Sequence, residues 1–312
     1  MTGKWKYLSA VPVLLCLAAS FGFYRFAFYY PKRDREDPQR PDEKENYKAY
    51  ADEMKKTIYE MDHLPYEEVT IKSRDGYPLY GRLYDNYPGR PLEIFFHGYH
   101  GTRYWDGYGC FRYCQEHRHN ILMIDERAHG NSGSNTITFG IKERYDCLAW
   151  ADYAAGRLGK DTKIVLSGVS MGAATVLMAS ELPLPSSVKA IIADCGYTSP
   201  EAIMKETARK EHIPVEAGFF FAKIGARLFG HFNVKESSAV KAVAKTQIPI
   251  LFIQGTEDQV VPPTMCDELF EACGSVKKRI TVKNSGHAVN AMTDPETYMR
   301  EVELFLKECG IE

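Results

Sequence analysis

The chain has 312 residues, of which 45% are hydrophobic, 12% aromatic and 26% charged. This composition is typical of a folded globular protein and excludes disordered, collagen-like and low-complexity chains. Thirty-nine basic and 41 acidic residues give a formal net charge of -2, and no basic run is interleaved with aromatic residues. Proteins that bind nucleic acid usually carry a basic patch, and therefore we predict no nucleic-acid partner.

The N-terminal segment is strongly apolar. Residues 7–24 carry no charge over 18 positions, with Lys4 and Lys6 before them and Arg25 after them. A run of this length is a transmembrane candidate, and the aromatic residues that crowd positions 21–30 are typical of a membrane–water interface. We therefore predict a single N-terminal span that anchors the protein in a lipid bilayer. Basic residues flank the run on both sides, so the side of the membrane stays open.

A cleaved signal peptide is the alternative reading of residues 1–30. Ala18-Ala19-Ser20 would serve as a small-residue cleavage site, and the mature protein would then be secreted. Residues 31–41 are charged and contain three prolines, which is typical of a linker. The periodicity of residues 43–61 predicts an amphipathic helix, so that linker and helix together occupy residues 31–65.

From residue 66 onward, short apolar runs alternate with segments of helical periodicity. This alternation predicts an α/β domain over residues 66–312, with a mostly parallel central sheet of about eight strands flanked by helices. The longest gap between strands predicts a small helical cap at about residues 199–248. The expected strands cover residues 67–72, 79–84, 92–96, 120–124, 163–167, 189–193, 249–253 and 279–283.

A candidate nucleophile follows the fifth expected strand. Gly168-Val169-Ser170-Met171-Gly172 is a G-x-S-x-G pattern between a strand and a helix. A serine on such a sharp turn projects its hydroxyl above the sheet, and the flanking glycines leave room for the tight backbone. The motif therefore predicts that Ser170 is a catalytic nucleophile.

An acid and a histidine follow the last two expected strands. Asp258 lies just beyond strand 249–253, with its neighbour Glu257 as the fallback, and His287 follows strand 279–283. Because active sites of open α/β sheets lie at the carboxyl ends of the strands, these side chains should meet Ser170. We predict His287 as the general base and Asp258 as the acid that holds it.

The oxyanion of an acyl-transfer reaction needs two backbone N–H donors. Met171 follows the nucleophile and supplies one of them. The other should follow strand 92–96, where the chain reads Phe96-His97-Gly98-Tyr99-His100, and we predict Tyr99 as this donor. His97 and His100 are expected to hold the loop by hydrogen bonds.

With these motifs in place, residues 66–312 resemble a serine hydrolase of the α/β-hydrolase superfamily, which has the same Ser-Asp-His order. Residues 125–133 further resemble the D-x-R-G-H-G-x-S motif of bacterial membrane-associated hydrolases of the Bem46 and serine aminopeptidase S33-like group. Ala128 departs from that motif, where the group often has glycine. The resemblance implies an α/β-hydrolase fold in which Arg127 and His129 tie down a loop and do not act in catalysis.

We therefore expect a serine hydrolase that cleaves the ester of a small acyl-containing substrate through an acyl-enzyme. The alternatives are an S33-like peptidase or amidase, a thioesterase or acyltransferase, and a catalytically silent binding scaffold. A peptidase for free amines should place an acid near its pocket, and Glu201 and Glu216 are the candidates. The absence of H-E-x-x-H, C-x-x-C, P-loop and dinucleotide motifs leads us to predict no metal and no cofactor. We predict no protein partner, and the cap should set the substrate.

Overall fold

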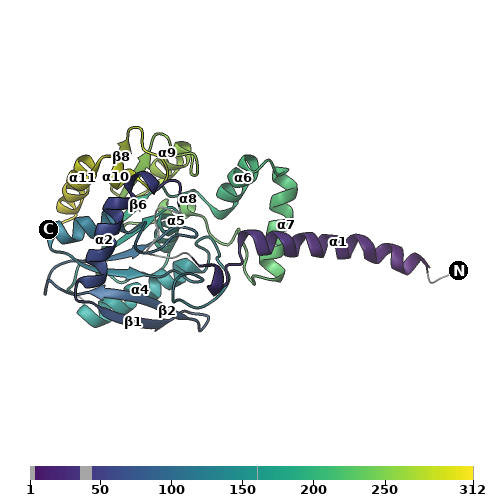
Figure 1. Cartoon of the computed structure of the whole chain (residues 1–312), viewed down its shortest axis with the longest axis horizontal. Coiled ribbons are helices and arrows are strands. Elements are labelled where there is room, and N and C mark those ends of the chain that lie inside the picture. The colour runs from purple at the N-terminus through teal and green to yellow at the C-terminus, as the bar shows by residue number, and fades with distance from the viewer. Residues whose placement is uncertain (1–3, 36–43, 160, 312) are drawn as a thin grey trace.

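The computed structural model describes residues 4–35, 44–159 and 161–311. One sheet forms the centre, helices lie on both of its faces, and a long N-terminal helix extends away from the body (Figure 1). The sheet contains eight strands in the order β1-β2-β4-β3-β5-β6-β7-β8. The strands are β1 Glu67–Lys72, β2 Pro78–Tyr84, β3 Leu92–Phe96, β4 Asn120–Ile124, β5 Ile164–Val169, β6 Val188–Asp194, β7 Ile250–Gly255 and β8 Lys277–Val282.

The strands from β4 to β8 along the sheet are parallel, whereas β2 pairs antiparallel with both β1 and β4. The predicted mostly parallel sheet of about eight strands is therefore confirmed. The central strands are buried on both faces, which explains their continuous apolar sequences. In β3, for example, Ile94 contributes to one hydrophobic core and Phe95 to the core on the other face.

Helices cover each face of the sheet because each has an apolar side to bury. In α2, for example, Met54, Ile58 and Met61 recur at helical spacing and are buried. One face is covered by α2 Ala51–His63, α3 Tyr108–His117 and α11 Pro295–Glu308, with the short α10 Asn290–Thr293 beside them. The opposite face is covered by α4 Glu143–Leu158, α5 Met171–Ala179, α8 Ala239–Val243 and α9 Pro263–Ala272.

The order of the strands creates the place for a site. From β3 the chain moves to β4 on one side of the sheet, and β5 then lies on the other side of β3. Connections at such a switch point diverge and leave a crevice at the carboxyl ends of the strands. The segment after β3 and the turn after β5 both open into this crevice.

Two helices of the segment between β6 and β7 project beyond the sheet. They are α6 Pro200–Lys210 and α7 Val215–Leu228, which lie against each other. Ser199 caps α6 by accepting the Ala202 N–H at 3.1 Å, and Pro200 occupies the first turn, where no intrahelical N–H partner is lost. Both helices lie within residues 199–248, which we expected to form a cap.

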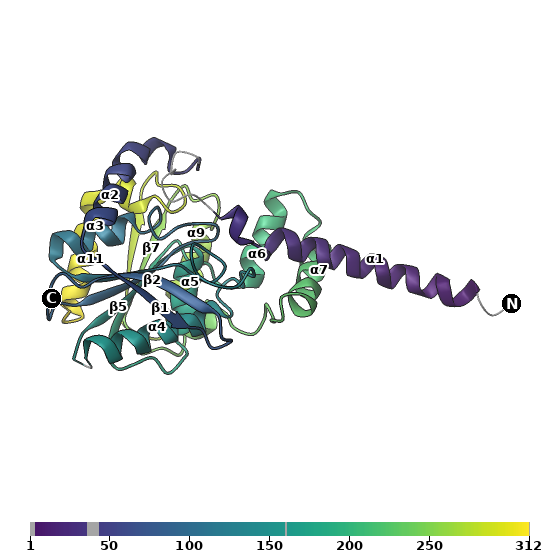
Figure 2. The same cartoon turned by 60° about the horizontal axis from the view of Figure 1, so that its bottom comes forward.

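The N-terminal apolar run forms α1, Lys4–Ala27, which lies alongside α7 in both views (Figures 1 and 2). Within the described residues, no helix combines the length and apolar character needed to cross a bilayer, and the prediction of a single N-terminal membrane span is therefore wrong. Part of the run is used in contact with protein: Ser20 is fully buried and Tyr24 is buried against the cap.

The chain returns to the sheet through residues 28–35. Arg35 donates hydrogen bonds from Nη1 to the carbonyl oxygens of Gly130 and Ser132, at 2.5 and 2.8 Å, and from Nη2 to that of Ser134 at 2.8 Å. Residues 36–41 of the predicted linker lie outside the described residues. The amphipathic helix expected over residues 43–61 begins later, because a 3₁₀ turn over Lys48–Tyr50 precedes α2.

Candidate active site

Ser170 occupies the sharp turn between β5 and α5. Its backbone has φ 55° and ψ -112°, a conformation that residues other than glycine rarely adopt. The turn needs glycine on each side because a Cβ at Gly172 would collide with the carbonyl oxygen of Phe96, and one at Gly168 would collide with the backbone of Gly172. The G-x-S-x-G sequence therefore permits a turn that presents the Ser170 hydroxyl at the edge of the sheet.

The structure brings Ser170, His287 and Asp258 together from three separate loops. His287 Nε2 lies 2.9 Å from Ser170 Oγ, and His287 Nδ1 lies 2.8 Å from Asp258 Oδ2. Because a carboxylate only accepts hydrogen bonds, Nδ1 carries the proton and Nε2 is left to accept the Ser170 hydroxyl proton. This arrangement is the one a general base requires.

The Asp258 carboxylate is buried and held by backbone donors. Its side chain is 0% exposed, and its Oδ1 accepts the N–H groups of Val260 and Val261, each at 2.8 Å. The amide of Gln254 adds a donor to Oδ2 at 3.2 Å. These three donors hold the Asp258 carboxylate in a fixed position beside His287. Glu257, the fallback acid, is exposed, and its side chain contacts Thr256 instead of His287.

The loop after β3 approaches the nucleophile closely. A Cβ at Gly98 would lie 3.4 Å from the Ser170 Cβ, and the Gly98 N–H donates to Asp106 Oδ2 at 2.5 Å. Asp106 in turn accepts the hydroxyl of Tyr47. Tyr99 and Met171 line the same cavity as Ser170, as an oxyanion hole would require. Met171 begins α5, and the first N–H groups of a helix have no intrahelical acceptor.

Two buried histidines fix this loop from below. His97 Nδ1 donates to the Gly98 carbonyl oxygen at 2.9 Å, and its Nε2 accepts the Glu126 N–H at 3.0 Å. Burial lowers the pKa of His97, so the ring is neutral, as this pattern needs. His129 Nε2 accepts the His100 N–H at 3.1 Å. His97 therefore holds the loop through its ring as expected, whereas His100 takes part through its backbone.

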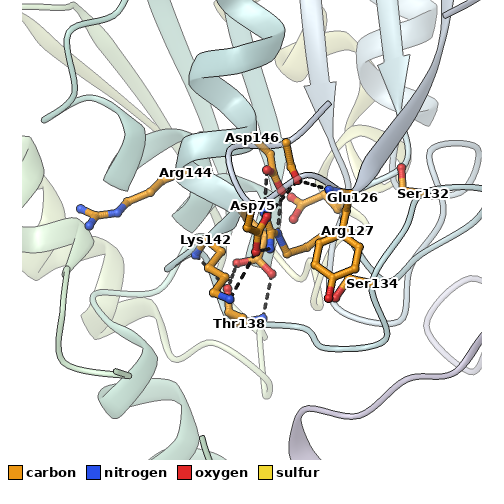
Figure 3. A network of polar contacts seen from close by, with 12 residues as sticks. Asp75, Glu126, Arg127, Ser132, Ser134, Thr138, Lys142, Arg144 and Asp146 are labelled. Atoms are coloured by element: carbon orange, nitrogen blue, oxygen red, sulfur yellow. Dashed lines mark hydrogen bonds and ion pairs between the residues drawn. The ribbon is translucent and has the colours of Figure 1, made fainter. Parts of the chain in front are cut away.

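Arg127 ties together three segments beneath the loop (Figure 3). Its guanidinium donates to both oxygens of Asp146, at 2.6 and 2.7 Å, and to both oxygens of Asp75, at 3.1 and 3.2 Å. Its contact with Asp75 holds the pKa of that carboxyl well below its usual range, against the opposing effect of burial. Arg127 is thus a structural residue, as its resemblance to the family motif implies.

We expect Arg127→Ala to lower the free energy of unfolding by about 3–5 kcal/mol, because it leaves the buried Asp146 carboxylate without its cation. Urea denaturation measures this loss. Arg157→Ala is the control, since Arg157 and Glu67 form a pair that is 50% and 54% exposed, and exposed pairs contribute at most about 1 kcal/mol. Equal stability losses in the two variants would contradict the role given to Arg127.

Asp194, at the end of β6, is a buried acid next to the candidate triad. Its Oδ1 accepts the Asn290 amide at 2.6 Å, and its backbone oxygen accepts the Ser170 N–H at 2.8 Å. Burial raises the pKa of Asp194 to about 7. Sequence reasoning missed Asp194, because nothing in its local pattern distinguishes it from an exposed acid at the end of a strand.

The raised pKa of Asp194 predicts a pH dependence of stability. The folded state keeps a proton on Asp194 that an unfolded aspartate releases at about pH 4. The contribution of Asp194 to the free energy of unfolding is therefore fully present below that pH. It should be lost as the pH rises to about 7, at up to about 1.4 kcal/mol per pH unit. Urea denaturation of the wild-type protein and Asp194→Asn across this range measures the difference. Parallel curves for the two proteins would show that Asp194 titrates normally.

An apolar cavity of about 450 Å³ opens above Ser170. Met171 and Tyr99 lie in its floor, while Ile203 of α6 and Phe219 of α7 line it from the cap. Phe23, Phe26 and Ala27 of α1 also line it, which the sequence analysis missed because these aromatic residues matched a membrane interface. Volumes of this size suit small organic ligands, and the lining favours an apolar one.

Apart from the group that contains Asp258 and His287, one cluster of described residues has side chains of metal-binding type close together. Glu93, Cys110 and Cys114 are buried with their ligand atoms within 4.8 Å of one another. Glu93 Oε2 accepts the Cys110 thiol at 3.3 Å and the Ser167 hydroxyl at 2.8 Å. Burial raises the pKa of both thiols, with that of Cys110 at about 12, so they are protonated donors. The Cys110 thiol and the Ser167 hydroxyl therefore both donate to Glu93 Oε2 within this cluster.

Two family models match the chain. The model described as alpha/beta hydrolase fold matches residues 94–212, and the model described as serine hydrolase (FSH1) matches residues 165–295. Among relatives, the uncharacterized protein YqkD of Bacillus subtilis is 27% identical over 188 residues, covering 60% of this chain and 62% of its own length. Protein bem46 of Schizosaccharomyces pombe is 26% identical over 222 residues, covering 70% and 69%.

Solved structures agree with the fold. The esterase Pf2001 of Pyrococcus furiosus matches with a TM-score of 0.66 and 22% identity, covering 81% of this chain and 94% of its own. Est1E from Butyrivibrio proteoclasticus, solved with ferulic acid, matches with a TM-score of 0.59 and 22% identity, covering 78% and 100%. The two family models together span residues 94–295, so this part of the chain belongs to the α/β-hydrolase superfamily, and one of the two models describes serine hydrolases.

Proposed function

We propose that the protein is a carboxylesterase in which Ser170, His287 and Asp258 form the catalytic triad. The observation that carries this proposal is the continuous chain of contacts, 2.9 Å from Ser170 to His287 and 2.8 Å from His287 to Asp258, at the floor of an apolar cavity. A neutral imidazole with its free nitrogen on the serine hydroxyl is the arrangement that activates a serine for acyl transfer.

In the proposed reaction, Ser170 Oγ attacks the ester carbonyl carbon while its proton passes to His287 Nε2. Asp258 stabilises the resulting imidazolium. The N–H groups of Tyr99 and Met171 receive the negative charge that develops on the carbonyl oxygen. The bond to the leaving alcohol then breaks, and His287 returns the proton to it. Water repeats the cycle on the acyl-enzyme and releases the carboxylic acid.

The charged residues of the cap favour an ester substrate over a peptide with a free amine. Glu201 contacts Lys205 and Lys235, at 3.1 and 2.9 Å, and Glu216 contacts Lys205 at 3.1 Å. Both acids therefore already have cationic partners, and neither lines the cavity above Ser170. Among the residues that the structure describes, no acid lines this cavity to receive a substrate ammonium, whereas an uncharged acyl chain fits the apolar lining.

A fluorophosphonate probe tests the proposal. We expect it to label the folded protein at Ser170, as located by mass spectrometry of the digested adduct, and to leave the heat-unfolded protein unlabelled. Para-nitrophenyl esters from acetate to decanoate should be hydrolysed in parallel. A folded protein that neither reacts with the probe nor hydrolyses any of these esters would refute the proposed function and favour a silent scaffold.

A further inference from the structure

The second half of α1 is packed into the cap with little space between the backbones. A Cβ at Gly225 of α7 would collide with the backbone oxygen of Ser20, so the helices can approach this closely only because residue 225 is glycine. The Phe23 ring lies against Gly218, whose Cβ would be 3.5 Å from it. The small residues of α7 therefore form a groove for α1.

Aromatic pairs hold the same interface along its length. Phe23 stacks on Phe221 with ring centroids 5.9 Å apart, and Phe21 meets the edge of Phe229 at 5.1 Å. Each such pair contributes beyond the apolar area it buries. Aromatic residues near the end of an apolar helix would suit a lipid interface, but here Phe21 and Phe23 have aromatic partners in the chain itself.

The end of α1 also contacts the loop that carries the proposed oxyanion donor. The Tyr99 hydroxyl donates to the Ala27 carbonyl oxygen at 3.2 Å. The Tyr99 ring stacks on His100 at 4.0 Å and on Phe139 at 5.1 Å, and His100 stacks in turn on Tyr30 at 3.9 Å. Because the side chain of Tyr99 is fixed by residues 27–30, the position of its backbone N–H depends on them.

These contacts bring α1 to the substrate cavity itself. Phe23, Phe26 and Ala27 line the cavity that contains Ser170, opposite residues of α6 and α7. Both views show α1 running beside the cap helices where they overhang the sheet (Figures 1 and 2). The cavity thus has three walls, which come from the oxyanion loop, the cap and the N-terminal helix.

We propose that α1 is part of the substrate site, where it binds the apolar acyl chain of a carboxylic ester and thereby sets the preferred chain length. This inference rests on the proposed function, because it takes ester hydrolysis at Ser170 as the reaction. The occupant is defined by the cavity: its walls are aromatic and aliphatic, and the reacting hydroxyl lies at its floor. An apolar chain would bury its surface there, and a long chain would bury more of it than an acetyl group.

Single substitutions in α1 test the inference in the full-length protein. Phe23→Ala and Phe26→Ala remove aromatic rings from the cavity wall, and Leu15→Ala removes apolar surface from α1 outside it. Phe26 and Leu15 are matched, since they are 65% and 66% exposed, so neither change should affect folding. We expect kcat/KM for para-nitrophenyl decanoate to fall about tenfold in each of the two phenylalanine variants. This is the effect of losing contact with about two methylene groups of the acyl chain.

Hydrolysis of para-nitrophenyl acetate should fall much less than decanoate hydrolysis in the two phenylalanine variants, because the loss is confined to chain contacts. Leu15→Ala should keep the wild-type ratio of decanoate to acetate. An unchanged ratio in Phe23→Ala and Phe26→Ala would overturn the inference. So would an equal loss with both esters, since α1 would then act on the oxyanion loop alone.

Failure of the proposed function can be told apart from failure of this inference. Decanoate binding, measured by isothermal titration calorimetry, needs no catalysis. If the protein hydrolyses no ester, weaker decanoate binding in Phe23→Ala and Phe26→Ala than in Leu15→Ala still supports the α1 wall. Equal decanoate binding in the three variants would overturn it, whatever the fate of the triad.

Discussion

Ser170→Ala is expected to lower kcat for para-nitrophenyl butyrate by about 10⁶-fold, because the variant has no nucleophile and hydrolysis depends on water alone. Residual catalysis above the uncatalysed rate should remain, since the two backbone N–H donors and the cavity stay in place. The free energy of unfolding should change little, because the side chain of Ser170 bonds to His287 and supports no other buried group.

Ser180→Ala is the matched control for this variant. Ser180 lies one residue beyond α5, is buried, and donates its hydroxyl to the Leu177 carbonyl oxygen at 2.7 Å. Its loss should cost about 1 kcal/mol of stability and leave kcat within a few-fold of the wild-type value. Turnover that persists in Ser170→Ala would contradict the assignment of the nucleophile, and a similar kcat loss in both variants would point to a general disturbance of α5.

Much of the sheet could be predicted because its strands are short apolar runs that end at glycine or at a polar residue. Strand β3 is an example: Leu92–Phe96 is buried at every position, and its sequence contains only one polar residue, Glu93. Strands buried on both faces have to read this way. The ends of the strands were predicted less accurately. For example, β8 begins at Lys277, whereas the sequence indicated a start at Arg279.

The partner of α1 could not be predicted from the sequence. An apolar run indicates that a helix is buried, but it does not distinguish burial in lipid from burial against another part of the protein. Residues 7–24 fit a bilayer by length, and the residues that receive α1 lie about 200 positions away in α7. Gly218 and Gly225 gave no signal of their own, since glycine in a helix has several causes. Only the fold reveals that they make room for Phe23 and Ser20.

The candidate site was more predictable than its supports. The rule that reactive groups gather at the carboxyl ends of parallel strands brings Ser170, Asp258 and His287 into one place from sequence alone. The rule says nothing of Asp106, which holds Gly98 from the turn before α3, nor of the buried Asp194. Such residues act through contacts distant in sequence, and nothing in their local pattern distinguishes them from surface acids.

The choice between two adjacent acids shows the same limit, and a substitution tests it. Asp258→Asn should lower kcat by about 10⁴-fold while the protein stays folded. The N–H groups of Val260 and Val261 both donate to Oδ1 of Asp258, so an asparagine would keep its carbonyl oxygen there and turn its NH₂ group toward His287. That amide donates to Nδ1, which moves the ring proton to Nε2 and leaves no acceptor for the Ser170 hydroxyl.

Glu257→Gln is the matched control, because it makes the same chemical change one residue away on an exposed side chain. Its kcat should equal the wild-type value. Titration of kcat/KM against pH, with urea denaturation to confirm folding, compares the two variants with the wild-type protein. A large loss in Glu257→Gln together with near-normal turnover in Asp258→Asn would assign the acid to Glu257. Since the Glu257 side chain faces Thr256 and the solvent, that result would require the loop after β7 to rearrange during catalysis.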